Sequence, residues 1–207
     1  MSLQQNLTDY RASVADCNSF ISFAHQQYAN GNYKINANLR KFISESAFLK
    51  IFIAWETFLE NSFIDYLMGE PSMLNNRPAR WATPISREHA NQLLIGTQKY
   101  VDWANPEISR KLSKIYFHEG YVFNTQLSAV NTELLDLKTI RNSAAHLSSS
   151  TSAKLDSLSS RLLNRQCNNY TAYKLLFSPD PNSTTGGTIL SNYLVVLDIS
   201  AEIIANG

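Results

Sequence analysis

The chain has 207 residues, of which 44% are hydrophobic and 17% are charged. This composition is typical of a globular protein and excludes disorder over the whole chain. Its 18 lysines and arginines nearly balance 17 acidic residues, for a formal net charge of +1. The balance excludes a strong general binder of nucleic acid or anionic membranes but leaves room for a local RNA pocket. We predict a single domain over residues 1–207.

Apolar residues recur at steps of three and four along the first part of the chain, which is the period of a helix face. A first helix is predicted over residues 7–28, ended by the Asn-Gly-Asn turn at residues 30–32. A second is predicted over residues 38–68, where Gly69 and Pro71 end it. Because this second helix is apolar on a broad face, we expect it in the centre of a bundle.

The middle of the chain contains a loop and two shorter helices. Residues 71–84 are rich in turn formers and are predicted to form the loop. Ser86 is the predicted N-cap of a helix that reaches about residue 100. Asn105 and Pro106 open another helix, with proline at the first position, and it ends before Gly120.

The last third of the chain is also predicted to be helical. One helix begins between residues 128 and 131 and runs to Leu147, residues 148–152 interrupt it, and a weaker helix covers residues 155–163. A loop at residues 179–188 precedes a final helix over residues 190–205, for which a short strand is the alternative. Since no apolar alternation of period two is found, we predict an all-α fold.

The chain shows no apolar signal sequence at its beginning, and its most apolar stretches, residues 48–55 and 193–199, are shorter than a membrane span. Cys17 and Cys167 lack the spacing of a metal site. We interpret both as free thiols in a reducing compartment, with a disulfide between them as the alternative. The predicted location is therefore cytoplasmic, without contact to a membrane.

Three polar residues stand out on the predicted helix that ends at residue 147. Arg141, Asn142 and His146 lie in the sequence IRNSAAHL. At 100° per residue, Asn142 is 100° and His146 is 140° from Arg141, so all three fit within one arc of the helix. One interpretation is a core network in which Arg141 pairs with Glu56 or Glu60. The other is a site of chemistry.

The pattern of Arg141, Asn142 and a histidine four residues later, late in a helical protein, resembles the HEPN superfamily. The segment AWETFLE at residues 54–60 and a last helix after a variable loop are similar features, and the chain resembles most the branch found beside RNA-ligase and phosphatase domains. The resemblance implies a HEPN-like bundle of five to seven helices with helical additions. It also implies a metal-independent endoribonuclease without cofactors, a toxin or defence effector held in check by an antitoxin partner.

The chemistry of these residues fits RNA cleavage. Histidine can accept the proton of the 2′-hydroxyl or donate one to the leaving oxygen, and arginine binds phosphate through two parallel hydrogen bonds. Asn142 can orient His146 or donate to phosphate. One copy of the motif supplies one titratable group, so we predict a homodimer that combines two copies in one cleft, an arrangement that the resemblance also implies.

Other candidate residues have weaker patterns. Glu56 and Glu60 lie four residues apart on one helix face and are predicted to support the site as partners of basic residues. Arg77 and Arg80 lie on the predicted loop and could bind the RNA backbone; a solvated loop is the alternative. Two further functions stay open: a non-catalytic HEPN module that binds RNA, nucleotide or protein, and a structural helical bundle.

Overall fold

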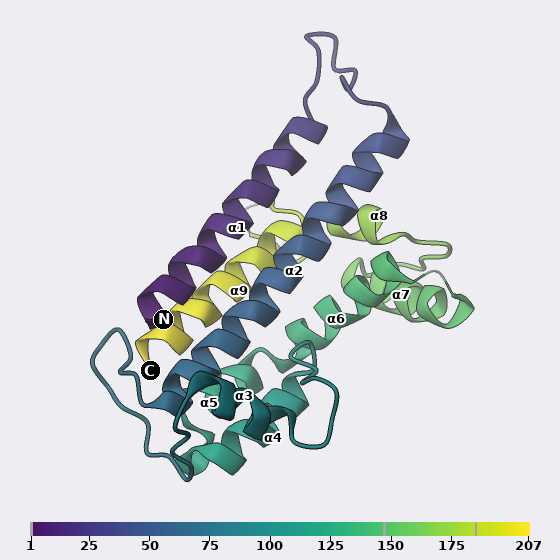
Figure 1. Cartoon of the computed structure of the whole chain (residues 1–207). Coiled ribbons are helices and arrows are strands. Elements are labelled where there is room, and N and C mark those ends of the chain that lie inside the picture. Colours follow the sequence, from purple (N-terminus) through teal and green to yellow (C-terminus); the bar gives the residue numbers. More distant parts are fainter. Residues whose placement is uncertain (1, 147, 185) are drawn as a thin grey trace. The chain divides into compact units, whose positions relative to one another are not determined.

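A computed structural model describes residues 2–146, 148–184 and 186–207 of the chain. Within these residues the fold is all-α, as predicted, and three isolated bridges are its only β-type pairings (Figure 1). The helices are α1 (Leu3–Ala24), α2 (Ala37–Met68), α3 (Arg87–Ile95), α4 (Pro106–Tyr116), the 3₁₀-helix η1 (His118–Gly120), α5 (Tyr121–Ala129), α6 (Asn131–Ala145), α7 (Ser149–Leu162), α8 (Ala172–Leu176) and α9 (Ile189–Asn206).

The chain divides into two compact units. The first unit comprises Met1–Arg11, Trp55–Leu135 and Val196–Gly207, and the second comprises Ala12–Ala54 and Asp136–Val195. The long helices α1, α2 and α9 each contribute residues to both units. The single domain expected over residues 1–207 stays a prediction.

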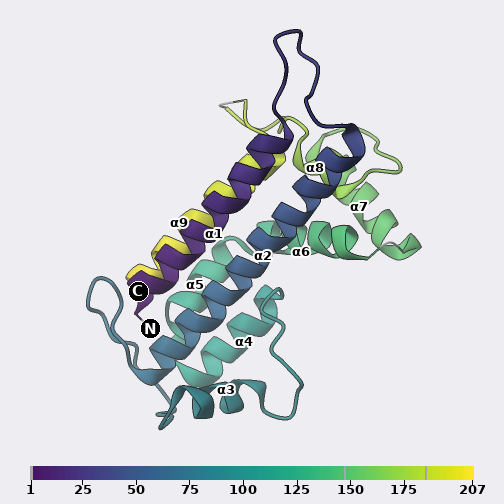
Figure 2. The ribbon, with the colours of Figure 1, turned by 45° about the horizontal axis from the view of Figure 1, so that its top comes forward.

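The first unit is built around the second half of α2. Figures 1 and 2 show α3, α4 and α5 beside this half of the helix and the two chain ends next to each other. Phe63 is fully buried, and its ring lies 5.0 Å from the rings of both Phe117 and Phe123 and 5.4 Å from that of Trp103. Aromatic rings in such tilted contacts stabilise a core beyond their buried area.

A buried charge in the first unit is paired. Asp65 on α2 is 1% exposed, accepts a hydrogen bond from Asn6 Nδ2 at 2.8 Å and forms an ion pair with Arg87 of α3. Arg87 also donates to Asn61 at 3.3 Å. These contacts tie α1, α2 and α3 together and satisfy a carboxylate that would be costly to bury alone.

The second unit holds α8 against α1 and α2. The ring of His25, just after α1, stacks on Phe177 with 4.6 Å between ring centroids and contacts Tyr173 of α8. The Tyr173 hydroxyl accepts from Arg40 at 2.9 Å, and its backbone N–H donates to Glu45 at 3.0 Å. Aromatic packing and side-chain hydrogen bonds therefore fix the short helix, which the sequence patterns did not predict.

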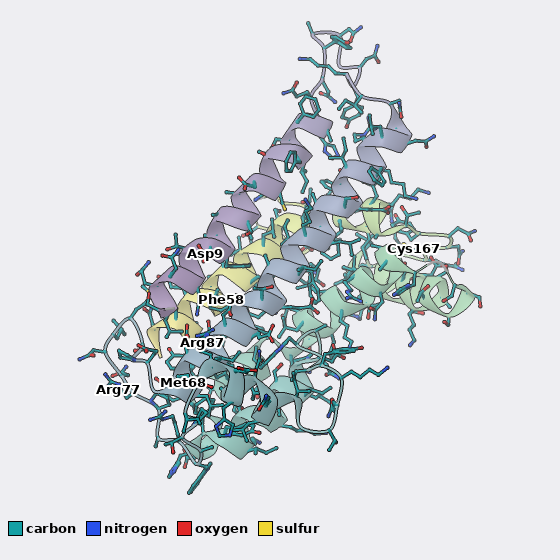
Figure 3. The ribbon with its side chains drawn as sticks, in the orientation of Figure 1. Asp9, Phe58, Met68, Arg77, Arg87 and Cys167 are labelled. Carbon is teal, nitrogen blue, oxygen red and sulfur yellow. The ribbon has the colours of Figure 1, made fainter. Side chains whose placement is uncertain are left out.

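Both cysteines lie in the second unit, where they are buried and free (Figure 3 labels Cys167). Burial is the main cause that raises the pKa of the Cys17 thiol above its ordinary value. The interpretation of both residues as free core thiols is confirmed.

Several predicted helix ends are confirmed. Ser86 caps α3 by accepting a hydrogen bond from the backbone of His89, and Asn105 caps α4 with Pro106 in its first turn. The second helix was placed correctly to within one residue. The first helix lies four residues earlier than predicted: it begins at Leu3 and ends at Ala24, because the residues that follow form a tight hairpin with a bridge between Gln27 and Tyr33. Similarly, α3 stops at Ile95 before Gly96, rather than near residue 100.

The chain does break between two helices as predicted, but the break does not extend over residues 148–152, because α6 ends at Ala145 and α7 already begins at Ser149. Ser148 is the N-cap of α7, and its side chain and that of Thr151 satisfy each other's backbone N–H groups in a capping box. These serines therefore start a helix instead of breaking one. The predicted end at Leu147 falls outside the described residues, and the helix before it ends at Ala145. The chain's last element is a helix, not the alternative strand.

Helix α9 is both long and apolar. Its 18 residues have a mean hydropathy of 1.4, which by length and composition would be enough to cross a membrane. Within this window 44% of the residues are buried in the protein, and the core helix of a soluble protein passes the same test. The helix is thus weak evidence for a membrane span.

The central position expected for α2 holds for only part of the helix. In the first unit Trp55, Phe58, Leu59 and Phe63 are all buried. In the second unit one face is buried while Phe42 and Ile53, on the opposite face, are 67% and 54% exposed. Both parts of α2 carry large apolar residues, but neighbours bury or half-bury every side chain only in the first unit, over residues 58–69.

Candidate functional site

The candidate site lies at the C-terminal end of α6 in the second unit. His146 follows the last helical residue and is exposed, whereas Arg141 and Asn142 are half-buried. Ser143, on the other side of the helix, is buried. The polar arc predicted from the sequence therefore lies along the edge of the helix, with its titratable residue open to solvent.

Two of the three residues contact each other directly. Arg141 Nη1 donates a hydrogen bond to Asn142 Oδ1 at 3.2 Å. Because the amide oxygen is engaged in this way, the Nδ2 group of Asn142 is its remaining donor. Within their own unit, Arg141 forms no ion pair with any described residue, so the guanidinium keeps donors for a phosphate group.

The backbone of His146 is held at both its N–H and its carbonyl. Its N–H donates to the carbonyl of Asn142 at 2.9 Å, which continues the hydrogen-bond pattern of α6. Its carbonyl accepts from Thr151 Oγ1 at 2.8 Å, and Thr151 belongs to the capping box of α7. The start of α7 thus fixes the histidine in place while its ring stays accessible.

A groove of about 510 Å³ runs between α6 and α7. Its lining residues are Asp136, Thr139, Ala153, Lys154, Ser157, Leu158 and Arg161. Thr139 and His146 are seven residues apart and therefore lie on nearly the same side of α6, about two turns from each other. The groove therefore lies on the same side of α6 as His146, although His146 is not one of its lining residues.

One end of the groove is fixed by a buried carboxylate. Asp136 accepts hydrogen bonds from Arg161 Nη2 at 2.5 Å and from the Tyr193 hydroxyl at 2.9 Å. Arg161 is thus occupied in holding α7 to α6, whereas Lys154 is exposed in the same groove. Sequence reasoning missed Lys154 and Thr139; the seven-residue spacing of Lys154 and Arg161 on α7 was the available signal.

The remaining predicted residues belong to the first unit. Glu56 and Glu60 lie half-buried on α2 in the first unit, and their role in supporting the site stays a prediction. Arg77 and Arg80 follow α2 and donate to its last carbonyls, Arg80 to Leu67 at 2.6 Å and Arg77 to Gly69 (Figure 3 labels Arg77).

The two arginines therefore cap the negative end of a helix. Gly69 adopts φ = +92°, and an added Cβ there would lie 2.8 Å from the Arg80 guanidinium, so the cap requires glycine at this position. Among the described residues, no three His, Cys, Asp or Glu side chains gather as a metal site would need.

No protein-family model, no curated protein sequence and no solved structure matches the chain. The resemblance to the HEPN superfamily stays a prediction from the residues of the motif and the helical pattern.

Proposed function

We propose that the protein is a metal-independent endoribonuclease of the HEPN type, acting through Arg141 and His146 with Asn142 in support. The observation that carries the proposal is the exposed imidazole of His146 at the end of α6, beside the Arg141–Asn142 pair. A solvent-open histidine with an arginine and an amide donor nearby can handle both the protons and the charge of a phosphodiester.

The proposed reaction needs no group outside the protein and the RNA. A base takes the proton of the ribose 2′-hydroxyl, and its oxygen attacks phosphorus. The bond from phosphorus to the 5′-oxygen breaks, and an acid protonates that oxygen. The products are a 2′,3′-cyclic phosphate and a 5′-hydroxyl. Arg141 and Asn142 Nδ2 stabilise the charge on the phosphorane.

Base and acid come from two histidines, one in each copy of a homodimer. A single chain supplies one His146, whereas a twofold axis supplies two. In each copy the groove between α6 and α7, with exposed Lys154, offers a path for the RNA strand toward His146. The balanced net charge fits such a local site better than broad binding along the RNA.

The test is cleavage of an unstructured RNA in the presence of EDTA. We expect the wild-type protein to cut, and His146→Ala or Arg141→Ala to lower the rate about 100-fold or more. His118→Ala is the matched control, since it removes an exposed histidine from the first unit. An RNA with 2′-O-methyl groups at the cut sites should resist cleavage, because it lacks the nucleophile.

Other outcomes would contradict the nuclease. RNA binding without turnover, unchanged by His146→Ala, would favour the non-catalytic binding module. Cleavage that EDTA abolishes would point to a metal-dependent reaction. If the nuclease is correct, a cytoplasmic toxin or defence effector controlled by an antitoxin protein is the proposed setting.

A further inference from the structure

The most unusual surface of the second unit is the outer face of α2. Large apolar side chains there are exposed to solvent: Leu39 to 45%, Phe42 to 67% and Ile53 to 54%. Ser46 and Leu49 continue the same row and are half-buried. We call these five residues the α2 stripe. Contiguous exposed apolar surface of this kind marks interaction sites more often than ordinary surface.

The spacing of the α2 stripe is that of a helix-pairing seam. Residues 39, 42, 46, 49 and 53 alternate steps of three and four, which is the heptad pattern of coiled coils. At 100° per residue they fall within an arc of about 80° and extend along about 21 Å of the helix. The buried residues Phe48 and Ile51 lie about 140° and 160° around the helix from the centre of the stripe, so the stripe is not part of the unit's own core.

The side chains of the α2 stripe favour another apolar helix as its partner. None of its five residues is charged, so it offers nothing to the phosphates of RNA. The pattern is also self-complementary: Ser46 lies at the centre, with apolar residues three to four and seven positions away on both sides. When two such helices pair antiparallel about a twofold axis at Ser46, Leu39 meets Ile53 of the other copy and the small serines allow close approach.

The flanks of the stripe permit this pairing. Lys50 lies on one side of the stripe and Glu45 on the other. Within the same unit, Glu45 accepts a hydrogen bond from the backbone N–H of Tyr173. On α1, which runs beside α2 in Figures 1 and 2, Phe20 and Phe23 are 53% and 55% exposed. They are further exposed apolar residues of the second unit, outside the stripe itself.

We propose that the α2 stripe is the interface between two copies of this chain, paired antiparallel about Ser46. The inference deepens the proposed function, which rests on a homodimer but does not say which surface forms it. The stripe and the candidate site at His146 belong to the same unit.

The first experiment measures the oligomeric state of the full chain by analytical ultracentrifugation. The wild-type protein is expected to be a dimer. The double variant Phe42→Glu with Ile53→Glu should weaken the dimer about 100-fold or more, because it buries two charges in an apolar seam. Ile115→Glu is the matched control: Ile115 is 60% exposed on α4, outside the stripe, and its substitution should leave the dimer intact.

The second experiment locates the twofold axis by disulfide trapping. The Ser46→Cys variant should form a covalent dimer under mild oxidation, while the native cysteines stay buried and unreactive. The Lys50→Cys variant should not, since the two copies of residue 50 would be about 12 Å apart along the helices, beyond disulfide reach. This test holds even if the double variant fails to fold.

The outcomes separate this inference from the nuclease proposal. A dimer that survives the double variant, without a disulfide at residue 46, overturns the stripe as the interface and leaves the nuclease standing. Loss of the dimer with RNA cleavage retained supports the stripe and overturns the composite cleft. A wild-type protein that is monomeric at all concentrations overturns both the stripe as a dimer interface and the composite cleft of the nuclease. The stripe would then be a candidate binding surface for a helix of another protein.

Discussion

The two halves of α2 have similar sequences but different surroundings. In the first unit Phe63 is fully buried among four aromatic neighbours, and in the second unit Phe42 is 67% exposed on the same helix. Both residues are large, apolar and at helical spacing from other apolar residues. The apolar sequence of a helix therefore predicts that its surface packs against other residues. It does not show whether those residues belong to the same chain or to another one.

Charged residues show the same contrast. Asp65 in the first unit is buried and paired with Arg87, which is a structural use of charge. Arg141 in the second unit is half-buried and contacts only its neighbour Asn142 within the described residues of that unit. Polar groups hold helices together in both units, as Asp136 and Arg161 do in the second, whereas Arg141 forms no ion pair within the described residues of its unit.

The largest expected effect comes from comparing two phenylalanines on α2. Phe63→Ala should lower the free energy of unfolding by about 4 kcal/mol, because it leaves a cavity in an aromatic core. Phe42→Ala should change it by no more than about 0.5 kcal/mol for the monomer. Urea denaturation at low protein concentration measures both. Equal losses would mean that the stripe is packed inside its own unit.

The next largest effect concerns the two arginines. Arg87→Ala should cost about 3 kcal/mol, since Asp65 would be left buried without its ion-pair partner. Arg141→Ala should cost less than about 1 kcal/mol, as expected for a half-buried residue with one short-range hydrogen bond. If Arg141→Ala lowers the free energy of unfolding as much as Arg87→Ala does, the result would favour a structural role of the motif over a catalytic one.

A smaller effect is expected at two helix N-caps. Ser148→Ala on α7 and Ser86→Ala on α3 should each cost about 1 kcal/mol of stability, because each removes an acceptor for a backbone N–H. Only Ser148→Ala should also slow RNA cleavage, because the capping box it shares with Thr151 holds the carbonyl of His146. RNA cleavage rates of the two variants are compared at equal folded fraction. This comparison separates an effect on stability from an effect on the position of His146.

The smallest effect is expected at Arg77 in the first unit. Arg77→Ala should cost about 0.5 kcal/mol, since the side chain is exposed and caps the last carbonyls of α2. RNA affinity, measured by fluorescence anisotropy, should stay unchanged, whereas Lys154→Ala in the groove should weaken it a few-fold. A weaker affinity for the Arg77 variant would restore the RNA-binding role first predicted for this loop.

Local signals in the sequence determined much of the secondary structure. The period of apolar residues placed α2 and α9, and the caps Ser86 and Asn105 placed the starts of α3 and α4, because such signals act between residues a few positions apart. The same signals brought Arg141, Asn142 and His146 to one arc of a helix. The errors, at residues 25–28 and 148–152, arose where a hairpin bridge or a capping box overrode the apparent pattern.

Only the tertiary structure decided which of these surfaces are covered. Arg77 and Arg80 looked like free loop cations until the end of α2 provided carbonyls for them. The short α8 exists because Glu45, Arg40 and His25 hold it, all more than a hundred residues away in the chain. Burial and long-range pairing depend on neighbours that no local pattern encodes, and for this reason only the folded chain shows that the α2 stripe is exposed and that a groove lies between α6 and α7.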